Sequence, residues 1–530
     1  MKLPPKLLKF CIYLLAAIAS LSTTLYIAST YVRKTFGSVS IESMIFNVRT
    51  SEACDPAIMV AYGIRAIPYV LLAVLAVILI FGAAHSVLTK ATLRASADPL
   101  LAWLVRLWAM VLCALRWCWT KLLAIRRAID EKPIILLCVI LLAVILATGK
   151  SVNRRLKVVD YLAQADTPFV EDHYARLSPQ SARFTTGRPK NLILIFSESL
   201  EYGYADKAAY GENLIPELME ATEGGLRLRG YRKTPGGYFT LDGISAQTLG
   251  MPLTHLPVDI HNDANTNAFG VMLKKSPGIF NLLQQAGYQT AFFSGTSRNF
   301  THKGDFLKVH GVTETFFKED WLAQGFELND GRRGFWDFND RFLMERFKAY
   351  IEKNLEKDRP FALGFETVDT HFPTGWAPPE ERRHHNAKDA FRFTSKLLAG
   401  FLSWAKTQAW YDETVIVVVG DHPWQDFAND FTNFTQKAPN REIFAAVLNS
   451  QRTNPAVRDC GFAPMDMAPT ILHAMGIEFA STLKDGATST SKIGLGTSLF
   501  SQEENLVCRY GTSGLTKLLQ GYSDFYNSLH

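Results

Sequence analysis

Side chains that could hold a metal ion follow two apolar, strand-like runs of this chain. Glu198 comes directly after NLILIFS, and Asp421 and His422 come directly after TVIVVVG. Thr240 follows a Gly-Gly pair and opens a stretch with helical spacing of apolar residues. Because functional groups gather at the carboxyl ends of strands in an open α/β sheet, we expect these four residues to meet at one point. Three oxygen atoms and one imidazole nitrogen would suit Mn²⁺, Mg²⁺ or Zn²⁺.

Thr240 is the candidate nucleophile. A free threonine hydroxyl is almost never ionised at neutral pH, so it needs a metal ion or an adjacent base. Its place at a helix N-terminus would favour an anion beside it. The residues alone leave other interpretations open. A threonine after two glycines is commonly only a helix N-cap, Glu198 could cap the helix that follows it, and Asp421-His422 could be an ordinary loop pair.

The order of several short motifs resembles a known family. The motifs are FSES, the threonine at the head of its helix, THFP, GDH and the late segment APMDMAPTILHAMGI, which opens a helix that we interpret as structural. Together they are similar to the alkaline phosphatase/sulfatase superfamily, and most of all to its membrane-anchored branch of lipoteichoic acid synthases and phosphoglycerol transferases. The resemblance extends over about Leu14 to Phe479. It implies an α/β fold in which N-terminal transmembrane helices precede an alkaline-phosphatase-like domain with a mostly parallel central sheet.

The resemblance also implies roles for individual residues. It implies one divalent metal ion, with Mn²⁺ as first choice and Mg²⁺ or Zn²⁺ as alternatives, and its ligands would be Glu198, Thr240, Asp421 and His422. His371 matches a histidine that contacts the phosphoryl or headgroup in the related transferases, and histidine titrates near neutrality as acid–base work requires. A histidine on a surface loop is the alternative. Its neighbours Asp369 and Thr370 are expected to be structural.

The stretch GTSRNFTHKGDFLKVHG resembles the family's substrate loop, in which an arginine and aromatic residues hold a phosphoglycerol headgroup. Here Lys303 stands where the arginine would be, Thr301 where a tryptophan would be and Ser294 where a histidine would be. A lysine is a point charge and not a bidentate fork, so phosphate contact is retained but the headgroup geometry differs. Arg298 and His302 are further substrate-binding candidates, and a solvated basic loop is the alternative.

The reaction implied by the resemblance is the transfer of phosphoglycerol from phosphatidylglycerol to a periplasmic or cell-envelope glycan, through a covalent phosphothreonine at Thr240. A phosphoethanolamine transferase is the nearest alternative, and a non-catalytic membrane scaffold is an alternative of a different class. A sulfatase would mature a Cys or Ser in a Pro- and Arg-containing motif, which the segment Thr240–Gly243 lacks. A plain phosphatase would carry a second metal cluster, for which we find no additional His and Asp set. The identity of the acceptor stays open.

Residues 1–149 predict a membrane domain. Apolar runs predict spans at about 10–32, 66–84 and 133–149. The segment at about 100–127 is rich in Leu and Trp but is interrupted by charges, so we predict a basic helix on the inner leaflet. Eight Lys or Arg residues lie between Thr89 and Lys132, and this positive-inside signal places the N-terminus in the cytoplasm. We therefore expect a multi-pass protein of the bacterial inner membrane.

The rest of the chain predicts a linker over 150–190 and a periplasmic catalytic domain over 191–530. Within that domain strand-like and helix-like segments alternate, as in a mostly parallel sheet. Strands are expected at 191–196, 289–293, 361–367, 414–419 and 443–448, and helices at 278–286, 340–355, 387–407 and 465–475.

Composition excludes some partners and leaves one bond open. The net charge of +6 is modest and spread out, which does not suggest a nucleic-acid partner, and much of the basic excess lies near the apolar segments, where anionic lipid is the simpler partner. Among the seven cysteines, Cys460 and Cys508 lie in the globular part. They could form a disulfide if that part is extracytoplasmic, but the sequence alone does not show that they meet.

Overall fold

The structure, a computed structural model, contains two compact units. It describes residues 5–36, 56–90, 133–156, 166–185, 190–254, 272–328, 338–356, 358–371, 375–384, 386–424, 441–456 and 459–530. One unit contains long apolar helices. The other contains an α/β fold, which is formed by the described residues from Asp166 onward. The basic helix predicted at about 100–127 lies outside the described residues.

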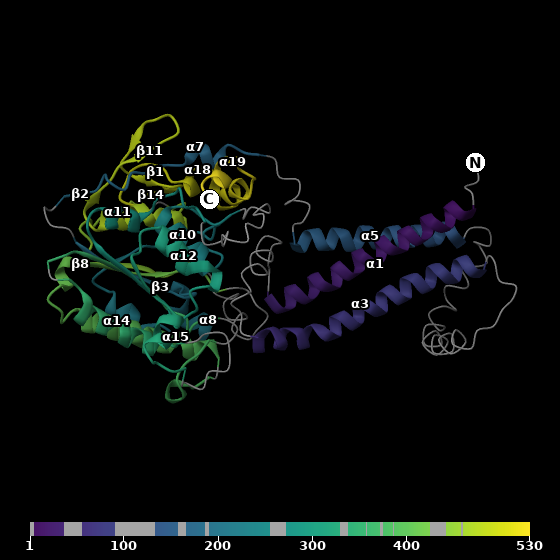
Figure 1. Cartoon of the computed structure of the whole chain (residues 1–530), viewed down its shortest axis with the longest axis horizontal. Helices are drawn as coiled ribbons and strands as arrows, with labels where there is room; N and C mark the ends of the chain where they lie inside the picture. The colour runs from purple at the N-terminus through teal and green to yellow at the C-terminus, as the bar shows by residue number, and fades with distance from the viewer. Residues whose placement is uncertain are drawn as a thin grey trace. The chain divides into compact units, whose positions relative to one another are not determined.

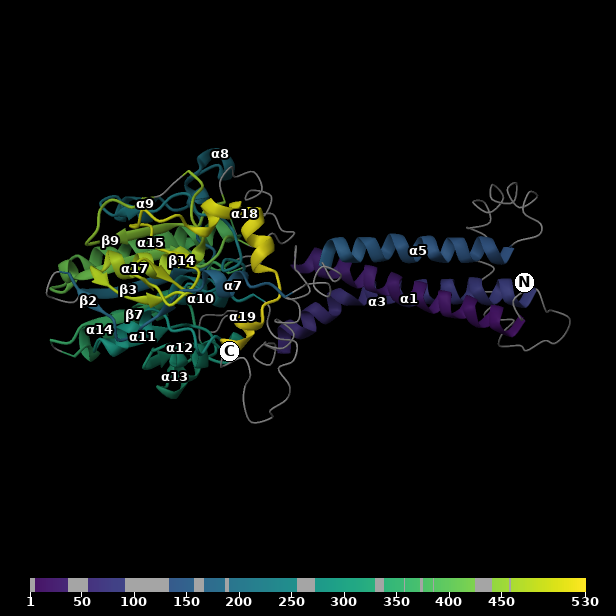
Figure 2. The ribbon, with the colours of Figure 1, turned by 90° about the horizontal axis from the view of Figure 1, so that it is seen from above.

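The first unit contains three helices that are long and apolar enough to cross a membrane. They are α1 (Pro5–Phe36), α3 (Pro56–Lys90) and α5 (Pro133–Leu156), which run side by side in Figures 1 and 2. The apolar stretches are Phe10–Val32, Ile64–Ala84 and Leu137–Arg154, which confirms the three predicted apolar helices. Small side chains such as Ala16, Ala19 and Ala84 pack between the helices, while leucines and valines such as Val70 and Leu71 are exposed. An exposed apolar surface of this kind suits lipid and not water.

The α/β unit is built on a mostly parallel sheet, as predicted. Among the described residues its strand order is β4 (Leu226–Arg227), β9 (Ala445–Leu448), β8 (Thr414–Gly420), β3 (Asn191–Ser197), β7 (Phe361–Glu366), β5 (Gln289–Phe293) and β6 (Glu314–Phe316). The five strands from β8 to β6 are parallel, whereas β9 and β4 are antiparallel to their neighbours. The central strand β3 therefore has β8 on one side and β7 on the other.

Both faces of this sheet are covered by helices, which explains the apolar runs in the sequence. Along β3, Leu192 and Leu194 pack into one core and Ile193 and Ile195 into the other. A strand that is buried on both faces has a continuous apolar sequence and no alternation. One face is covered by α9 (Pro216–Ala221), α14 (Asp340–Asn354) and α15 (Ala387–Ala405), and the other by α10 (Thr240–Leu249), α11 (Ile279–Gln285), α12 (Lys303–Val309) and α17 (Met467–Ala474) (Figure 1).

The predicted strands and helices of this unit agree with the structure to within two residues at each end. The helix predicted at 465–475 is divided into a 3₁₀ turn, η7 (Pro464–Asp466), and α17. The remaining elements between β3 and β9 are η2 (Tyr202–Ala205), α8 (Lys207–Tyr210), η4 (Phe300–His302), α13 (Lys318–Ala323), η5 (Pro379–Glu381) and η6 (Tyr411–Glu413).

The predicted linker over 150–190 is in part a folded portion of the α/β unit. Helix α5 continues to Leu156, and residues 166–185 contain α7 (Phe169–His173), β1 (Arg176–Leu177) and β2 (Arg183–Phe184). Strand β1 pairs with β11 (Ser481–Thr482), and β2 pairs with β10 (Ile477–Glu478). Phe169 and Val170 are buried, so this segment contributes apolar side chains to the core. The prediction of a plain linker was therefore wrong for these residues.

A disulfide bond fixes the C-terminal part of the α/β unit. The last elements are β12 (Thr488–Ser489), β13 (Lys492–Ile493), β14 (Gly496–Thr497), α18 (Leu506–Leu519) and α19 (Asp524–Ser528). Cys460 and Cys508 are bonded, with their Cα atoms 5.1 Å apart, and this bond ties the segment before η7 to the first turn of α18. The structure thus forms the pairing that the sequence left open.

Candidate metal centre

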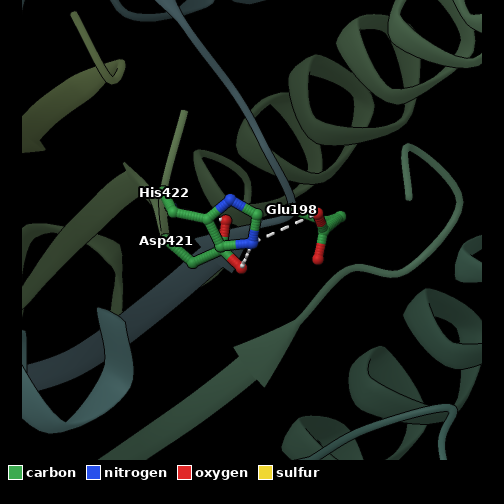
Figure 3. A group of neighbouring side chains, drawn as sticks. All are labelled: Glu198, Asp421 and His422. Atoms are coloured by element: carbon green, nitrogen blue, oxygen red, sulfur yellow. Dashed lines mark hydrogen bonds and ion pairs between the residues drawn. The ribbon is translucent and has the colours of Figure 1, made fainter. Parts of the chain in front are cut away.

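Glu198, Asp421 and His422 form a buried cluster at the carboxyl ends of β3 and β8. These strands are neighbours, and Ser197 pairs with Gly420, so the chain places Glu198 beside Asp421. One ligand atom of each residue lies within 4.8 Å of the other two. Nε2 of His422 is 3.5 Å from Oε1 of Glu198 and 3.5 Å from Oδ2 of Asp421. Figure 3 shows this ring nitrogen facing both carboxylates.

The second nitrogen of His422 determines which atom can bind a metal ion. Nδ1 lies 2.9 Å from the carbonyl oxygen of Pro423. Because a carbonyl can only accept, Nδ1 carries the proton and the lone pair of the neutral ring is on Nε2. Burial alone would lower the pKa of His422, but the charges of Asp421 and Glu198 outweigh burial and raise that pKa above its ordinary value. The raised pKa favours a second proton, which would bind at Nε2. A metal cation at Nε2 would take the place of this second proton.

Asp421 offers one carboxylate oxygen to the cluster. Its Oδ1 accepts hydrogen bonds from the backbone N–H groups of Ser199 and His422, both at 2.8 Å. Its Oδ2 is buried and has no hydrogen-bond partner among the described residues. Burial and the charge of Glu198 raise the pKa of Asp421 to about 6. Two buried carboxylates are costly without a nearby cation, so these residues fit a divalent ion held by Glu198, Asp421 and His422.

Thr240 joins this cluster through its hydroxyl group. It is the first residue of α10, and the N-cap position is occupied by Phe239, so Thr240 is not the N-cap of its helix. Oγ1 of Thr240 donates a hydrogen bond to Oε2 of Glu198 at 3.1 Å. Thr240 is only partly buried. Thr240 thus lies partly exposed at a helix N-terminus, while its hydroxyl group contacts the buried carboxylate of Glu198.

Three residues of α10 hold this helix against the cluster. A Cβ atom on Gly243 would lie 2.2 Å from the carbonyl oxygen of Asp421, so only glycine permits this close approach. Gln247 donates from Nε2 to the carbonyl oxygens of Gly420 at 3.0 Å and Asp421 at 3.3 Å. Asp242 is buried and accepts from three backbone N–H groups of the loops that flank α10. We did not predict roles for Asp242 and Gln247. Polar residues on a helix that is buried on all sides need hydrogen-bond partners, and this could have indicated that they hold α10 in place.

We expect Gly243→Ala to weaken the metal centre and the fold together. The added methyl group meets backbone atoms of Asp421, which cannot rotate away, so the substitution should cost about 1–3 kcal/mol of unfolding free energy. It should also weaken Mn²⁺ binding, because α10 must move away from β8. Thermal unfolding and Mn²⁺ titration measure the two effects.

The matched control for this prediction is Gly400→Ala. Gly400 lies in α15, and a Cβ atom there would meet nothing within 4 Å. The same substitution should therefore stabilise the protein by about 0.5–1 kcal/mol and leave Mn²⁺ binding unchanged. If Gly243→Ala and Gly400→Ala had the same unfolding free energy and the same Mn²⁺ affinity, the close packing of α10 on β8 would be contradicted.

Two basic residues of the predicted substrate loop, Lys303 and Arg298, are held in ion pairs. Lys303 is fully buried, and its ammonium group contacts Oε1 of Glu366, the last residue of β7. Arg298 contacts Glu319 and Asp320 on α13. Despite Lys303, burial raises the pKa of Glu366. The structure therefore places Lys303 beside the strand end, and a direct phosphate contact by it stays a prediction.

The backbone that leads into Lys303 has an uncommon conformation. Thr301 and His302 have positive φ angles of 56° and 53°, in the left-handed region that non-glycine residues rarely adopt. Such strain persists only where the surrounding structure enforces it. The role of His302 in substrate binding stays a prediction.

His371 lies at the same edge of the sheet, beyond the end of β7. Its backbone N–H donates to the carbonyl oxygen of Val368 at 3.1 Å, and the side chain is partly buried. The preceding residue, Thr370, donates from Oγ1 to the carbonyl oxygen of Glu198 at 2.6 Å. Asp369 accepts from the N–H of Asp340 at 3.0 Å. These contacts fit the structural roles expected for Thr370 and Asp369 and bring the backbone of His371 close to that of Glu198.

Lys233 is a basic residue near the cluster that the motifs did not indicate. It is exposed, and its charge counteracts the rise in the pKa of His422. Its ammonium nitrogen lies 6.0 Å from the centre of the Tyr238 ring, in the loop that leads to Thr240. Lys233 thus supplies positive charge near the cluster from an exposed position.

Comparison with known proteins matches residues 190–477 to the Sulfatase family. Relatives called phosphoglycerol transferase I are 27% identical over 339 residues in Salmonella arizonae and 28% identical over 342 residues in Escherichia coli strain 55989. Each alignment covers 60% of this chain but only 44% of the relative, so this chain matches less than half the length of these proteins. The structure of the lipoteichoic acid synthase LtaP from Listeria monocytogenes has 15% identity and a TM-score of 0.47, over 70% of this chain and 97% of that chain.

Proposed function

The chain belongs to the sulfatase family, and we propose that it transfers phosphoglycerol from phosphatidylglycerol to a glycan of the cell envelope. The observation that carries this proposal is the hydroxyl of the partly exposed Thr240, which contacts Glu198 of the buried cluster at 3.1 Å. The relatives called phosphoglycerol transferase I support the choice of donor. The three apolar helices support a donor that stays in a membrane.

The first half of the reaction would form a phosphothreonine. Glu198, Thr240, Asp421 and His422 would hold one divalent ion, Mn²⁺ as first choice, which lowers the pKa of the threonine hydroxyl and neutralises phosphoryl charge when bound. Oγ1 of Thr240 forms a bond to the phosphorus of the donor, and the bond from phosphorus to the diacylglycerol oxygen breaks. The hydroxyl proton passes to Oε2 of Glu198, which it already contacts. The departing diacylglycerol oxygen takes a proton, for which His371 is our candidate.

The second half would return the site to its starting state. A glycan hydroxyl oxygen attacks the phosphorus and gives its proton to His371, and the bond from phosphorus to Thr240 breaks. Glu198 returns the proton to Oγ1 of Thr240. Lys233, Lys303, Arg298 and His302 are our candidates for holding the anionic phosphodiester and its headgroup, with Lys303 acting from its ion pair with Glu366.

We place the α/β unit on the periplasmic side of the bacterial inner membrane. The excess of Lys and Arg between Thr89 and Lys132 supports a cytoplasmic location for that segment. The disulfide between Cys460 and Cys508 supports an oxidising compartment for the α/β unit, because such bonds are rare in the cytosol. A membrane anchor then keeps the site within reach of a lipid that does not leave the bilayer.

The test is the mass of the Thr240 peptide after the full-length protein is incubated with Mn²⁺ and mixed phospholipids. We expect a glycerophosphate adduct, which is absent from Thr240→Ala. A phosphoethanolamine adduct would keep the mechanism and replace the donor. No adduct and no lipid turnover with any divalent metal would refute the transferase and leave a membrane scaffold as the function.

A further inference from the structure

A single peptide plane connects the metal-centre histidine to a second buried carboxylate. Nδ1–H of His422 donates to the carbonyl oxygen of Pro423 at 2.9 Å. The N–H of the same peptide unit, that of Trp424, donates to Oε1 of Glu201 at 2.8 Å. A trans peptide is planar, and its C=O and N–H point in opposite directions. The carboxylate of Glu201 therefore lies at one edge of this peptide unit, and the imidazole of His422 lies at the opposite edge.

Glu201 is held firmly in this position. Its side chain is completely buried, and it is paired with Arg441, whose Nε and Nη2 donate to its two oxygens at 2.6 and 2.8 Å. Nη2 of Arg441 also donates to the carbonyl oxygen of Trp424 at 2.5 Å. Both the N–H and the C=O of Trp424 are thus held by the Glu201–Arg441 pair. The indole of Trp424 is fully buried, which further restricts this segment.

We propose that Glu201 is a positioning residue for the metal centre, which acts on His422 through the Pro423–Trp424 peptide plane. Glu201 fixes the orientation of that plane, the Pro423 carbonyl then fixes the tautomer of His422, and the Nε2 lone pair stays directed at the metal ion. A carboxylate that accepts from the peptide N–H also polarises the carbonyl, which strengthens the second hydrogen bond. The arrangement extends the usual carboxylate–histidine–metal relay by one peptide unit.

Stability alone is a weak explanation for this arrangement. A buried Glu–Arg pair costs desolvation energy that its attraction offsets only with good geometry, and apolar side chains of similar volume commonly stabilise as well or better. The pair holds both backbone polar groups of Trp424, which lies two residues beyond a metal-centre histidine. The role of Glu201 rests on the proposed metal centre. The experiment must therefore distinguish a failure of this role from a failure of the metal centre itself.

The test compares Zn²⁺ and Mg²⁺ affinities of the full-length protein, because imidazole nitrogen contributes much more to Zn²⁺ binding than to Mg²⁺ binding. In Glu201→Gln we expect the Zn²⁺ affinity to fall about tenfold, at the lower end of the effects of outer-shell partners. The Mg²⁺ affinity should fall by less than about threefold. A role in general stability would lower the two affinities equally, so the ratio between them is the informative quantity.

Glu442→Gln is the matched control. Glu442 also accepts from an arginine and from a backbone N–H, namely Arg229 at 3.0 Å and Gly230 at 3.1 Å, but it has no contact with Trp424 among those that the structure describes. This variant should keep both affinities. If Glu201→Gln does not fold, Glu201→Asp keeps the charge for Arg441 and withdraws the carboxylate from Trp424, with the same expected ratio.

The outcomes separate this inference from the proposed metal centre. Wild-type protein that binds neither ion would overturn both. Wild-type protein that binds Zn²⁺, together with Glu201 variants that bind both ions as the wild type does or lose both equally, would overturn only the role of Glu201. Glu201 variants that lose Zn²⁺ affinity while keeping Mg²⁺ affinity would support the positioning role of Glu201.

Discussion

Thr240→Ala is expected to reduce phosphoglycerol transfer by at least about 10⁴-fold, in the range seen when a catalytic nucleophile is removed from other enzymes. The physical reason is that, among the described residues, the neighbouring hydroxyl of Ser199 does not occupy the same place. Oγ1 of Thr240 contacts Glu198, whereas the hydroxyl of Ser199 donates to the other oxygen of that carboxylate at 2.5 Å from a fully buried position. Release of diacylglycerol from phosphatidylglycerol in Mn²⁺ measures the effect.

Thr240→Ser is the matched variant for this prediction. It keeps the hydroxyl and loses only the methyl group, which restricts the side-chain rotamer. We expect it to retain transfer within about tenfold to hundredfold of the wild type, since a misplaced nucleophile costs rate without abolishing it. Mn²⁺ binding should persist in both variants, because Glu198, Asp421 and His422 are untouched. It should be weaker in Thr240→Ala, which lacks one of the four proposed ligands. Full activity in Thr240→Ala would exclude Thr240 as the nucleophile.

The site residues that could be predicted from the sequence are those whose own neighbouring residues indicate their place in the fold. The runs before Glu198 and Asp421 predicted β3 and β8 because a strand buried on both faces must be apolar throughout. The carboxyl ends of parallel strands lie at the same edge of a sheet. Thr240 was expected at this edge as well, because a helix N-terminus favours an anion beside it. The sequence did not show that β3 and β8 are neighbours, since pairing depends on packing between segments far apart in the chain.

The contacts that could not be predicted are those without a local signal. Glu201 and Trp424 are separated by 223 residues, and Lys303 and Glu366 by 63 residues. Glu201, Trp424 and Glu366 look like ordinary residues until the fold brings their partners beside them. Lys303, although a substrate-binding candidate, has no local sign of an ion pair. The folded part of the predicted linker was missed for a similar reason. Strands β1 and β2 have two residues each and form only because β11 and β10 offer their edges.

Asp421→Asn is expected to abolish Mn²⁺ binding while keeping the fold. The amide oxygen can still accept the backbone N–H groups that Oδ1 accepts, namely those of Ser199 and His422. The amide nitrogen then replaces Oδ2, the oxygen without a hydrogen-bond partner among the described residues, and presents N–H groups where a cation would bind. We expect the affinity for Mn²⁺ to fall by about a thousandfold or more, beyond the tenfold to hundredfold effect of an outer-shell partner. Isothermal titration measures it.

Although Asp421→Asn should bind Mn²⁺ less tightly, its fold should be more stable than that of the wild type in the absence of metal. Burial and Glu198 raise the pKa of Asp421 to about 6, so in the metal-free protein its charged form opposes folding as the pH rises from about 4 through 6. At pH 7.5 metal-free Asp421→Asn should therefore be more stable than metal-free wild type by about 1–3 kcal/mol. Saturating Mn²⁺ should cancel or reverse this difference, because an ion at a hundredfold excess over its Kd stabilises the wild type by about 2.7 kcal/mol. A wild type that Mn²⁺ does not stabilise would contradict the metal centre, since two buried carboxylates without a cation would then serve only to weaken the fold.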